Sequence, residues 1–212
     1  MIHMKNCIVA QSGGPTAAIN ASLAGVIKGV LDQEKYGKIY GSLNGITGIL
    51  EGRFLDLTET FQDSGNLELL KVSPAMYLGS CRYKLPKLEE GMGDYQKIFA
   101  FFEKMEIGAF FYIGGNDSMD TVDKLSAYAE KIKSPVRIIG IPKTIDNDLC
   151  VTDHTPGFGS AAKYVAASLL EIYHDTVIYN LKSVTVVEIM GRDAGWLTAA
   201  SVLARNGYCP AP

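Results

Sequence analysis

The sequence predicts an α/β fold, a doubly wound and mostly parallel sheet with helices on both faces. Apolar runs of strand length alternate with segments of helical periodicity from end to end, and this alternation implies right-handed crossovers between parallel strands. Four segments rich in Gly or Asp directly follow predicted strands, at the edge where such a sheet binds ligands. Of the 212 residues, 47% are hydrophobic and 20% are charged. That composition is globular and excludes disordered, collagen-like and coiled-coil classes.

The first part of the chain begins with a short buried strand, predicted over residues 7–10. A helix is predicted from Thr16 to about Gln33, because its apolar residues recur along one stripe. A second strand is predicted over residues 38–43. The following residues, 44–86, are rich in Gly and Pro, and few regular elements are predicted there.

Regular alternation returns after residue 86, where Ile98, Phe101, Phe102 and Met105 follow the i, i+3, i+4, i+7 spacing of a helix face. The predicted elements are a helix over 94–106, a strand over 109–113, a helix over 118–132, a strand over 137–141, a loop over 142–156, a helix over 158–175, a strand over 184–189 and a helix over 194–204.

Charge, cysteine spacing and the N-terminal sequence indicate a reduced, cytoplasmic protein. The net charge of −3 gives no basic footprint for nucleic acid. The N-terminus lacks the features of a signal peptide, and no apolar stretch approaches the roughly 18 residues that span a membrane. Cys7, Cys81, Cys150 and Cys209 are widely spaced without a C-x-x-C pair, and the three histidines show no zinc spacing.

Ser12-Gly13-Gly14 leads from the first predicted strand into a helix. Glycines allow close approach of the backbone to a phosphate, and the helix N-terminus supplies N–H donors and a favourable dipole. A tight turn without a ligand is an equally open interpretation. The segment matches neither the dinucleotide fingerprint nor the Walker motif.

Gly114-Gly115-Asn116-Asp117-Ser118 repeats this arrangement and adds a carboxylate. An acid beside a phosphate loop is useful mainly when a divalent cation lies between them. Asp117 or Ser118 is also predicted to cap the following helix, which is compatible with that role.

The segment over residues 142–148, Pro-Lys-Thr-Ile-Asp-Asn-Asp, follows a buried strand and concentrates reactive side chains. Asp146 is placed to take a proton from an attacking hydroxyl, and Lys143 to neutralise phosphate charge. A solvated turn is the alternative, since the composition is also typical of an exposed loop.

Two arginines are further candidates for phosphate binding, because guanidinium groups bind phosphate in a bidentate manner. Arg192 follows the predicted strand 184–189, where a salt bridge to Asp193 or Glu188 is the alternative. Arg82 lies in the irregular region, which we expect to fold over the site. Cys81 beside it is predicted to be small and buried rather than nucleophilic.

Taken together, these segments resemble the phosphofructokinase family. The resemblance extends from residue 7 to about residue 204 and implies a Rossmann-like fold, the large lobe of that family. It is carried by six segments in the family's order: Ser12-Gly13-Gly14, Leu78-Gly79-Ser80-Cys81-Arg82, Gly114-Gly115-Asn116-Asp117-Ser118, residues 142–148, Gly157-Phe158-Gly159-Ser160-Ala161 and Met190-Gly191-Arg192.

The resemblance implies roles for the residues that match the family's motifs. Gly14 contacts the phosphoryl donor, and Arg82 steadies the transferring group. Asp146 matches the proton acceptor that activates the 1-hydroxyl of fructose 6-phosphate. The residues implied to bind substrate or organise the metal around it are Thr144, Ile145, Asp148, Met190, Gly191 and Arg192.

Donor choice is implied by two positions at which ATP-using members of the family typically have glycine. Asp117 places negative charge near the α-phosphate of ATP, and Lys143 suits a small, highly charged diphosphate. The resemblance therefore favours the diphosphate-dependent branch. An ATP-dependent enzyme, or a phosphate-binding fragment without turnover, remains an alternative.

The implied cofactor is Mg²⁺, with Asn116 and Asp117 as candidate ligands. Asn116 stands where the family usually has a magnesium-binding aspartate. Chains of the family continue well beyond the position of Pro212 into a second lobe, and the resemblance implies that a further strand begins within residues 206–210. We therefore expect residues 1–212 to form the donor-binding and catalytic lobe, truncated at the C-terminus and with the second lobe largely absent. The family also implies a homodimer or homotetramer.

Overall fold

The computed structural model describes residues 5–205, and the chain divides into two compact units, Met1–Lys143 and Thr144–Pro212. The first unit contains the sheet, and the described part of the second unit contains helices only. None of the helices described is long and apolar enough to cross a membrane. The expectations for residues 206–210 and for Cys209 lie outside the described residues.

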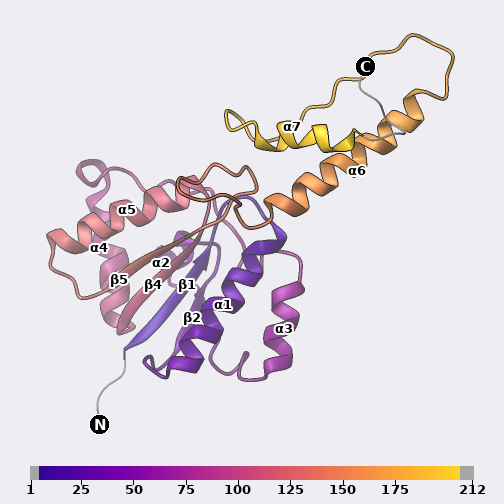
Figure 1. Cartoon of the computed structure of the whole chain (residues 1–212). Coiled ribbons are helices and arrows are strands. Elements are labelled where there is room, and N and C mark those ends of the chain that lie inside the picture. Colours follow the sequence, from indigo (N-terminus) through magenta and orange to yellow (C-terminus); the bar gives the residue numbers. More distant parts are fainter. Residues whose placement is uncertain (1–4, 206–212) are drawn as a thin grey trace. The chain divides into compact units, whose positions relative to one another are not determined.

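A five-stranded sheet forms the centre of the first unit, in the order β3-β2-β1-β4-β5 (Figure 1). Strands β1 (Asn6–Gln11), β2 (Ile39–Ser42), β4 (Ile107–Gly114) and β5 (Arg137–Pro142) are parallel, and β3 (Phe54–Asp56) pairs antiparallel with β2. The chain passes from β1 to β2 on one side and returns to β4 on the other. The strand order therefore reverses between β1 and β4, where α/β sheets form a ligand-binding crevice at the carboxyl ends of the strands.

Helices cover both faces of this sheet, as predicted (Figure 1). Helices α1 (Ala17–Gln33) and α3 (Ser64–Val72) share one hydrophobic core, while α2 (Ile46–Glu51), α4 (Leu88–Lys104) and α5 (Asn116–Lys131) share the other. Strand β1 belongs to both: Cys7 and Val9 pack into the first core, and Ile8 and Ala10 into the second. Alternation of side chains across the strand produces this division, and burial on both faces explains why β1 reads as a continuous apolar run.

Two parts of the first unit differ from the sequence-based expectation. Helix α4 begins at Leu88 rather than at residue 94, and it contains a kink at Gly91, whose φ is −131°. Glu89 and Glu90 lie in its first turn, where negative side chains are favourable. The irregular region contains α2, β3 and α3, each too short to give a clear periodic pattern.

A substitution at Gly48 tests how tightly α2 is packed. A Cβ atom there would overlap the Leu43 carbonyl oxygen and lie 2.7 Å from the Arg53 carbonyl oxygen. We expect Gly48→Ala to lower the free energy of unfolding by about 1–3 kcal/mol, because backbone must move. In the control Gly29→Ala, in α1, a Cβ meets nothing within 4 Å, and the helix should gain about 0.5–1 kcal/mol. Urea unfolding of both variants measures this, and equal effects would contradict it.

The second unit contains α6 (Phe158–Thr176), the short helix α7 (Trp196–Ala200) and a 3₁₀ turn, η1 (Ser201–Ala204). Helix α6 agrees with its prediction. The predicted helix over 194–204 is shorter, because Gly195 adopts a left-handed φ of 68° immediately before α7.

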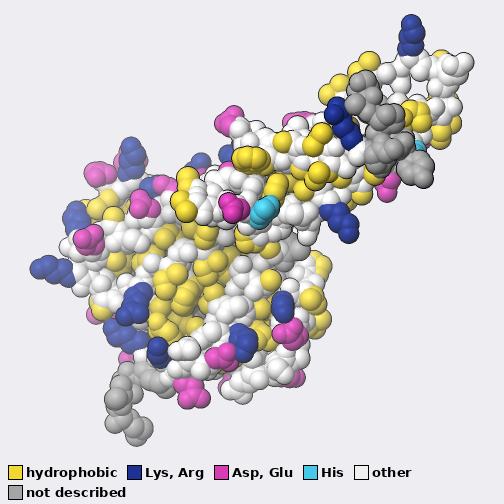
Figure 2. All heavy atoms as spheres, in the orientation of Figure 1, with side chains coloured by type: hydrophobic (Ala, Val, Ile, Leu, Met, Phe, Trp, Pro, Cys, Tyr) yellow, Lys and Arg dark blue, Asp and Glu magenta, His cyan; other side chains and the backbone are white. Residues whose placement is uncertain are grey.

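The predicted strand over 184–189 is wrong. These residues carry no strand, and Val184 and Val186 are 91% and 89% exposed. Their alternating apolar pattern is that of a strand, but a strand needs a hydrogen-bonded neighbour. Residues 144–205 contain no strand that could serve as one. Hydrophobic side chains consequently lie on the surface of this unit (Figure 2).

Candidate functional site

The carboxyl ends of β1, β4 and β5 meet at one edge of the sheet, and the segments that follow them are bonded together. The Ser12 N–H donates to the Ile113 carbonyl oxygen at 2.9 Å. The Lys143 N–H donates to the Gly114 carbonyl oxygen at 2.8 Å. The glycine loop after β1, the start of α5 and Lys143 therefore lie side by side within the first unit.

Glycine is required where these segments approach each other. Gly13 has a φ of 86°, and a Cβ atom there would lie 3.4 Å from the Gly115 nitrogen and 3.6 Å from Lys143 Nζ. A Cβ on Gly114 would overlap Ser118 Oγ and lie 2.9 Å from the Ser12 carbonyl oxygen. The loop therefore exposes backbone rather than side chains, as a close contact with a phosphate requires.

Lys143 places a positive charge directly against the glycine loop. Its side chain is only 8% exposed, and Nζ donates to the Gly14 carbonyl oxygen at 2.6 Å. An ammonium group carries three N–H donors and no acceptor. Charge in a site with little water acts more strongly than charge on the surface. Gly14 and Lys143, both selected from the sequence, are thus in contact.

Asn116 and Asp117 are the first residues of α5, and both side chains are exposed. Asp117 Oδ1 lies 3.4 Å from Lys84 Nζ, with both side chains mostly exposed, so this pair contributes little stability. The prediction that Asp117 or Ser118 caps the helix is wrong. The N-cap is Gly115, without a side-chain cap bond, because α5 begins earlier than predicted and includes both residues.

The segment that carries Arg82 folds against the glycine loop, as the sequence led us to expect. The Ser80 hydroxyl donates to the Gly13 carbonyl oxygen at 2.8 Å, and the Ser12 hydroxyl donates to the Cys81 carbonyl oxygen at 3.0 Å. Arg82 follows directly and is exposed. The two hydrogen bonds fix the backbone next to Arg82 beside the glycine loop.

Sequence reasoning missed two buried amides that hold this segment, Gln11 and Asn20. Gln11 Nε2 donates to Asn20 Oδ1 at 3.0 Å, and Gln11 Oε1 accepts the Leu78 N–H at 2.9 Å. Asn20 Oδ1 also accepts the Tyr77 N–H at 3.0 Å. The sequence did carry a signal for both. Gln11 ends a buried strand and Asn20 lies beside the apolar stripe of a helix, and a polar side chain at such a buried position needs a hydrogen-bond partner.

In the second unit, residues 144–148 form a bonded loop rather than a freely solvated turn. Thr144 Oγ1 accepts the Asp146 N–H at 3.0 Å. Asn147, with a left-handed φ of 59°, accepts the Thr155 N–H at 2.8 Å and donates to the Asp153 carbonyl oxygen at 3.0 Å. Asn147 is a further residue that the sequence did not single out, and its side chain closes the loop around a half-buried Asp146.

The other candidates in this unit lie in more open positions. Asp148 is exposed, and Ile145 packs near Gly157, where a Cβ atom would lie 3.1 Å from Ile145 Cγ2. Gly191, with a φ of 134°, accepts the Ala194 N–H at 2.9 Å. The exposed residues 190 and 192 flank it, and Arg192 forms no ion pair within the described residues. In that part of the chain, no hydrogen bond joins residues 144–148 to residues 190–192.

Cys81 and Cys7 differ in their surroundings. Burial raises the pKa of Cys7 to about 12. Burial also raises the pKa of Cys81, but hydrogen bonds from the backbone at Tyr83 and Thr47 and from the side chains of Ser12 and Tyr112 outweigh it, so that its pKa lies below the ordinary value. These bonds stabilise the thiolate beside the glycine loop.

Alkylation tests this difference. At pH 8 the thiolate fraction of Cys7 is about a thousandfold below that of a thiol with an ordinary pKa, and Cys81 exceeds the ordinary fraction. We therefore expect iodoacetamide to modify Cys81 well before Cys7, while exposed Cys150 serves as the accessible reference. Mass spectrometry of the separated peptides follows each site. Equal rates at Cys7 and Cys81 would contradict the assignment.

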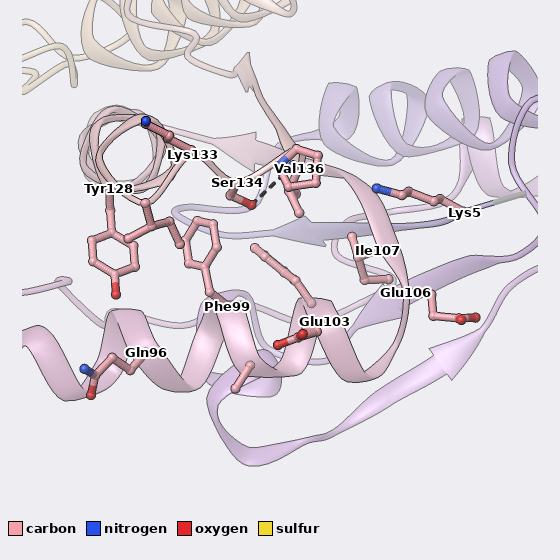
Figure 3. A pocket seen from close by; sticks show the side chains of 14 residues that line it. Lys5, Gln96, Phe99, Glu103, Glu106, Ile107, Tyr128, Lys133, Ser134 and Val136 are labelled. Carbon is pink, nitrogen blue, oxygen red and sulfur yellow. Dashed lines mark hydrogen bonds between the residues drawn. The ribbon is translucent and has the colours of Figure 1, made fainter.

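A cavity of about 720 Å³ lies at the opposite edge of the sheet, between the ends of α4 and α5 and the start of β4 (Figure 3). The rings of Phe99 and Tyr128 form part of its wall, with centroids 5.1 Å apart. Charges of both signs, Lys5, Glu103 and Lys133 among them, surround it. None of the residues selected from the sequence lines this cavity, so it is separate from the candidate site.

Known proteins similar to this chain share a family and a fold. The family model described as phosphofructokinase matches residues 6–209. Pyrophosphate–fructose 6-phosphate 1-phosphotransferase of Halomonas elongata is 43% identical over 205 residues, 95% of this chain and 48% of that protein. The protein of the same name in Rhodospirillum rubrum is 47% identical over 202 residues, 94% of this chain and 47% of that protein.

A solved structure of pyrophosphate-dependent phosphofructokinase from Nitrosospira multiformis superimposes with a TM-score of 0.87 at 42% identity, covering 98% of this chain and 51% of that one. The chain thus spans about half the length of the curated relatives it matches. The family model over residues 6–209, the identities of 43% and 47% and the structural superposition show that the chain belongs to the phosphofructokinase family.

Proposed function

We propose that residues 1–212 form the donor-binding and catalytic part of a phosphotransferase. It would move a phosphoryl group from diphosphate to the 1-hydroxyl of fructose 6-phosphate and give fructose 1,6-bisphosphate. The observation that carries the proposal is the contact between the Lys143 ammonium and the Gly14 carbonyl at the carboxyl ends of three parallel strands. Two relatives that match nearly the whole chain are named for this reaction.

The donor side is built for a small, highly charged anion. Lys143 is buried against the glycine loop, and the start of α5 contributes backbone N–H groups that favour negative charge. Asp117 adds a negative charge beside them, which disfavours a longer nucleotide whose α-phosphate would lie there. This arrangement supports diphosphate over ATP as the donor.

A divalent metal, Mg²⁺, is part of the proposal, and the residues present fit a metal that arrives with the donor. The described residues contain no group of three or more His, Cys, Asp or Glu that could hold a metal ion. Mg²⁺ typically uses one or two protein oxygens together with substrate phosphates and water. Asn116 and Asp117 would supply those oxygens. When bound, Mg²⁺ neutralises charge on the diphosphate.

The acceptor side requires a base and charged groups that bind a sugar phosphate. The oxygen of the 1-hydroxyl attacks the nearer phosphorus, the bond to the bridging oxygen breaks, inorganic phosphate leaves, and Asp146 accepts the hydroxyl proton. Lys143 and Arg82 stabilise the charge of the transferring group. The proposed sugar-phosphate contacts are Thr144, Ile145, Asp148, Met190, Gly191 and Arg192.

Location and assembly belong to the same proposal. A reducing cytoplasmic location is supported by three free thiols, Cys7, Cys81 and Cys150. A homodimer or homotetramer is proposed from the family to which the chain belongs.

Phosphorus NMR tests the proposed reaction on the chain itself, mixed with Mg²⁺, diphosphate and fructose 6-phosphate. The proposal predicts that diphosphate disappears while inorganic phosphate and fructose 1,6-bisphosphate grow in equal amounts. Turnover with ATP in place of diphosphate would make the chain an ATP-dependent kinase. Binding of diphosphate without any product would make it a binding module.

A further inference from the structure

Ser80 and the glycine loop after β1 are joined by two hydrogen bonds that run in opposite directions. The Ser80 hydroxyl donates to the Gly13 carbonyl oxygen at 2.8 Å, across 67 residues of sequence. The Ser12 hydroxyl donates to the Cys81 carbonyl oxygen at 3.0 Å, across 69 residues. These two bonds hold the segment of Ser80 and Cys81 against the glycine loop.

The Ser80 bond fixes the orientation of the peptide between Gly13 and Gly14. A trans peptide is planar, with its C=O and N–H on opposite sides. Because the Gly13 carbonyl points to Ser80, the Gly14 N–H points the other way. Glycine imposes little conformational preference of its own, so an outside bond is needed to select one orientation.

The carbonyl groups of both glycines in the loop are held by donors of the protein. Ser80 binds the Gly13 oxygen and Lys143 Nζ binds the Gly14 oxygen, at 2.8 Å and 2.6 Å. Carbonyl oxygens facing a phosphate would repel it, whereas N–H groups attract it. Within residues 5–205, the Gly14 N–H donates to no other group. The two glycine carbonyl oxygens are therefore occupied, and the Gly14 N–H is left as a donor for an anion.

Ser80 is itself firmly placed. The Leu78 N–H donates to Gln11 Oε1 at 2.9 Å, and the Leu78 carbonyl oxygen accepts the Asn44 N–H at 2.8 Å. Asn44 Nδ2 donates to the Ser80 carbonyl oxygen at 3.2 Å. Gly79, with a φ of 70°, leaves no room for a Cβ, which would lie 2.5 Å from Asn44 Nδ2. These contacts prevent Ser80 from following a loop that turns away.

We propose that Ser80 is a positioning residue for the phosphoryl donor, acting through the Gly13–Gly14 peptide. This inference rests on the proposed function, in which the anion at this loop is diphosphate. Ser80 touches the loop and not the donor. Its loss should therefore weaken donor binding and leave the affinity for fructose 6-phosphate unchanged.

Calorimetric titration with Mg²⁺-diphosphate tests this role. For Ser80→Ala we expect binding about fivefold to tenfold weaker, the effect of one lost hydrogen bond. Ser80→Thr retains the hydroxyl and should restore affinity. The matched control is Ser134→Ala, because Ser134 is a half-buried serine whose hydroxyl bonds the backbone N–H of Val136 at the opposite edge of the sheet. Unchanged affinity in Ser80→Ala would overturn the inference.

A second measurement keeps the inference separate from the proposed function. If the unaltered chain fails to bind Mg²⁺-diphosphate, the proposed function fails, but the order of the loop can still be measured without ligand. Nitrogen-15 relaxation should give the Gly14 amide a rigid order parameter in the unaltered chain and in Ser80→Thr. In Ser80→Ala it should fall toward about 0.6, the range of flexible backbone. An order parameter that does not change in Ser80→Ala would overturn the inference.

Discussion

Replacement of Asp146 by Asn should lower the rate of phosphoryl transfer by about 10²–10⁴-fold, the usual contribution of a positioned general base. Asn retains the size of the side chain and removes only the ability to accept a proton. The loop should remain intact, because its bonds come from the Asp146 N–H and from Asn147 rather than from the Asp146 carboxylate. Steady-state turnover with diphosphate and fructose 6-phosphate measures the change.

Asp153→Asn is the matched control for this variant. Asp153 is an exposed carboxylate in the same loop, and it bonds Asn147 through its backbone oxygen. Its replacement should leave turnover unchanged. If Asp146→Asn retained the activity of the unaltered chain while Asp153→Asn lost it, the base would be assigned wrongly.

Replacement of Lys143 by Met should weaken diphosphate binding by about tenfold to a hundredfold, the cost of losing a charge-assisted hydrogen bond to an anion. Met occupies a similar volume but has no charge and no N–H donor. The variant also loses the bond to the Gly14 carbonyl oxygen, one of the two bonds that hold the glycine carbonyl groups of the loop. Calorimetric titration with Mg²⁺-diphosphate measures the affinity.

An exposed lysine separates this effect from a general loss of positive charge. Lys97→Met, in α4, changes the net charge by the same amount and should bind diphosphate as the unaltered chain does. Far-ultraviolet circular dichroism establishes that both variants are folded. Equal affinities in Lys143→Met and Lys97→Met would remove Lys143 from the donor site.

The sheet and its helices could be predicted because the first unit obeys simple periodicity. Strands β1 and β4 are buried on both faces and read as continuous apolar runs, and α1 and α5 carry long helical patterns, as does α6 in the second unit. The segments that follow the strands were also predictable, since Gly and Asp concentrate there. The contact between Gly14 and Lys143 follows from that topology, although 129 residues separate them.

Other features depend on contacts that no local pattern records. Residues 184–189 have the composition of a strand. Whether such a segment forms a strand depends on the strands beside it more than on its own sequence. Gln11 and Asn20 gain their importance from backbone groups more than 50 residues away. The short elements α2 and β3 likewise lack the length that a periodic signal requires.

Separate titrations of the unaltered chain with the two donors test whether the site prefers diphosphate. Calorimetric titrations with diphosphate and with ATP, each with Mg²⁺, compare the two donors at the loop formed by Gly13, Gly14 and Lys143. Diphosphate should bind measurably, and ATP should bind at least about tenfold more weakly, equivalent to about 1.4 kcal/mol. Tighter binding of ATP, or binding of neither donor, would contradict it.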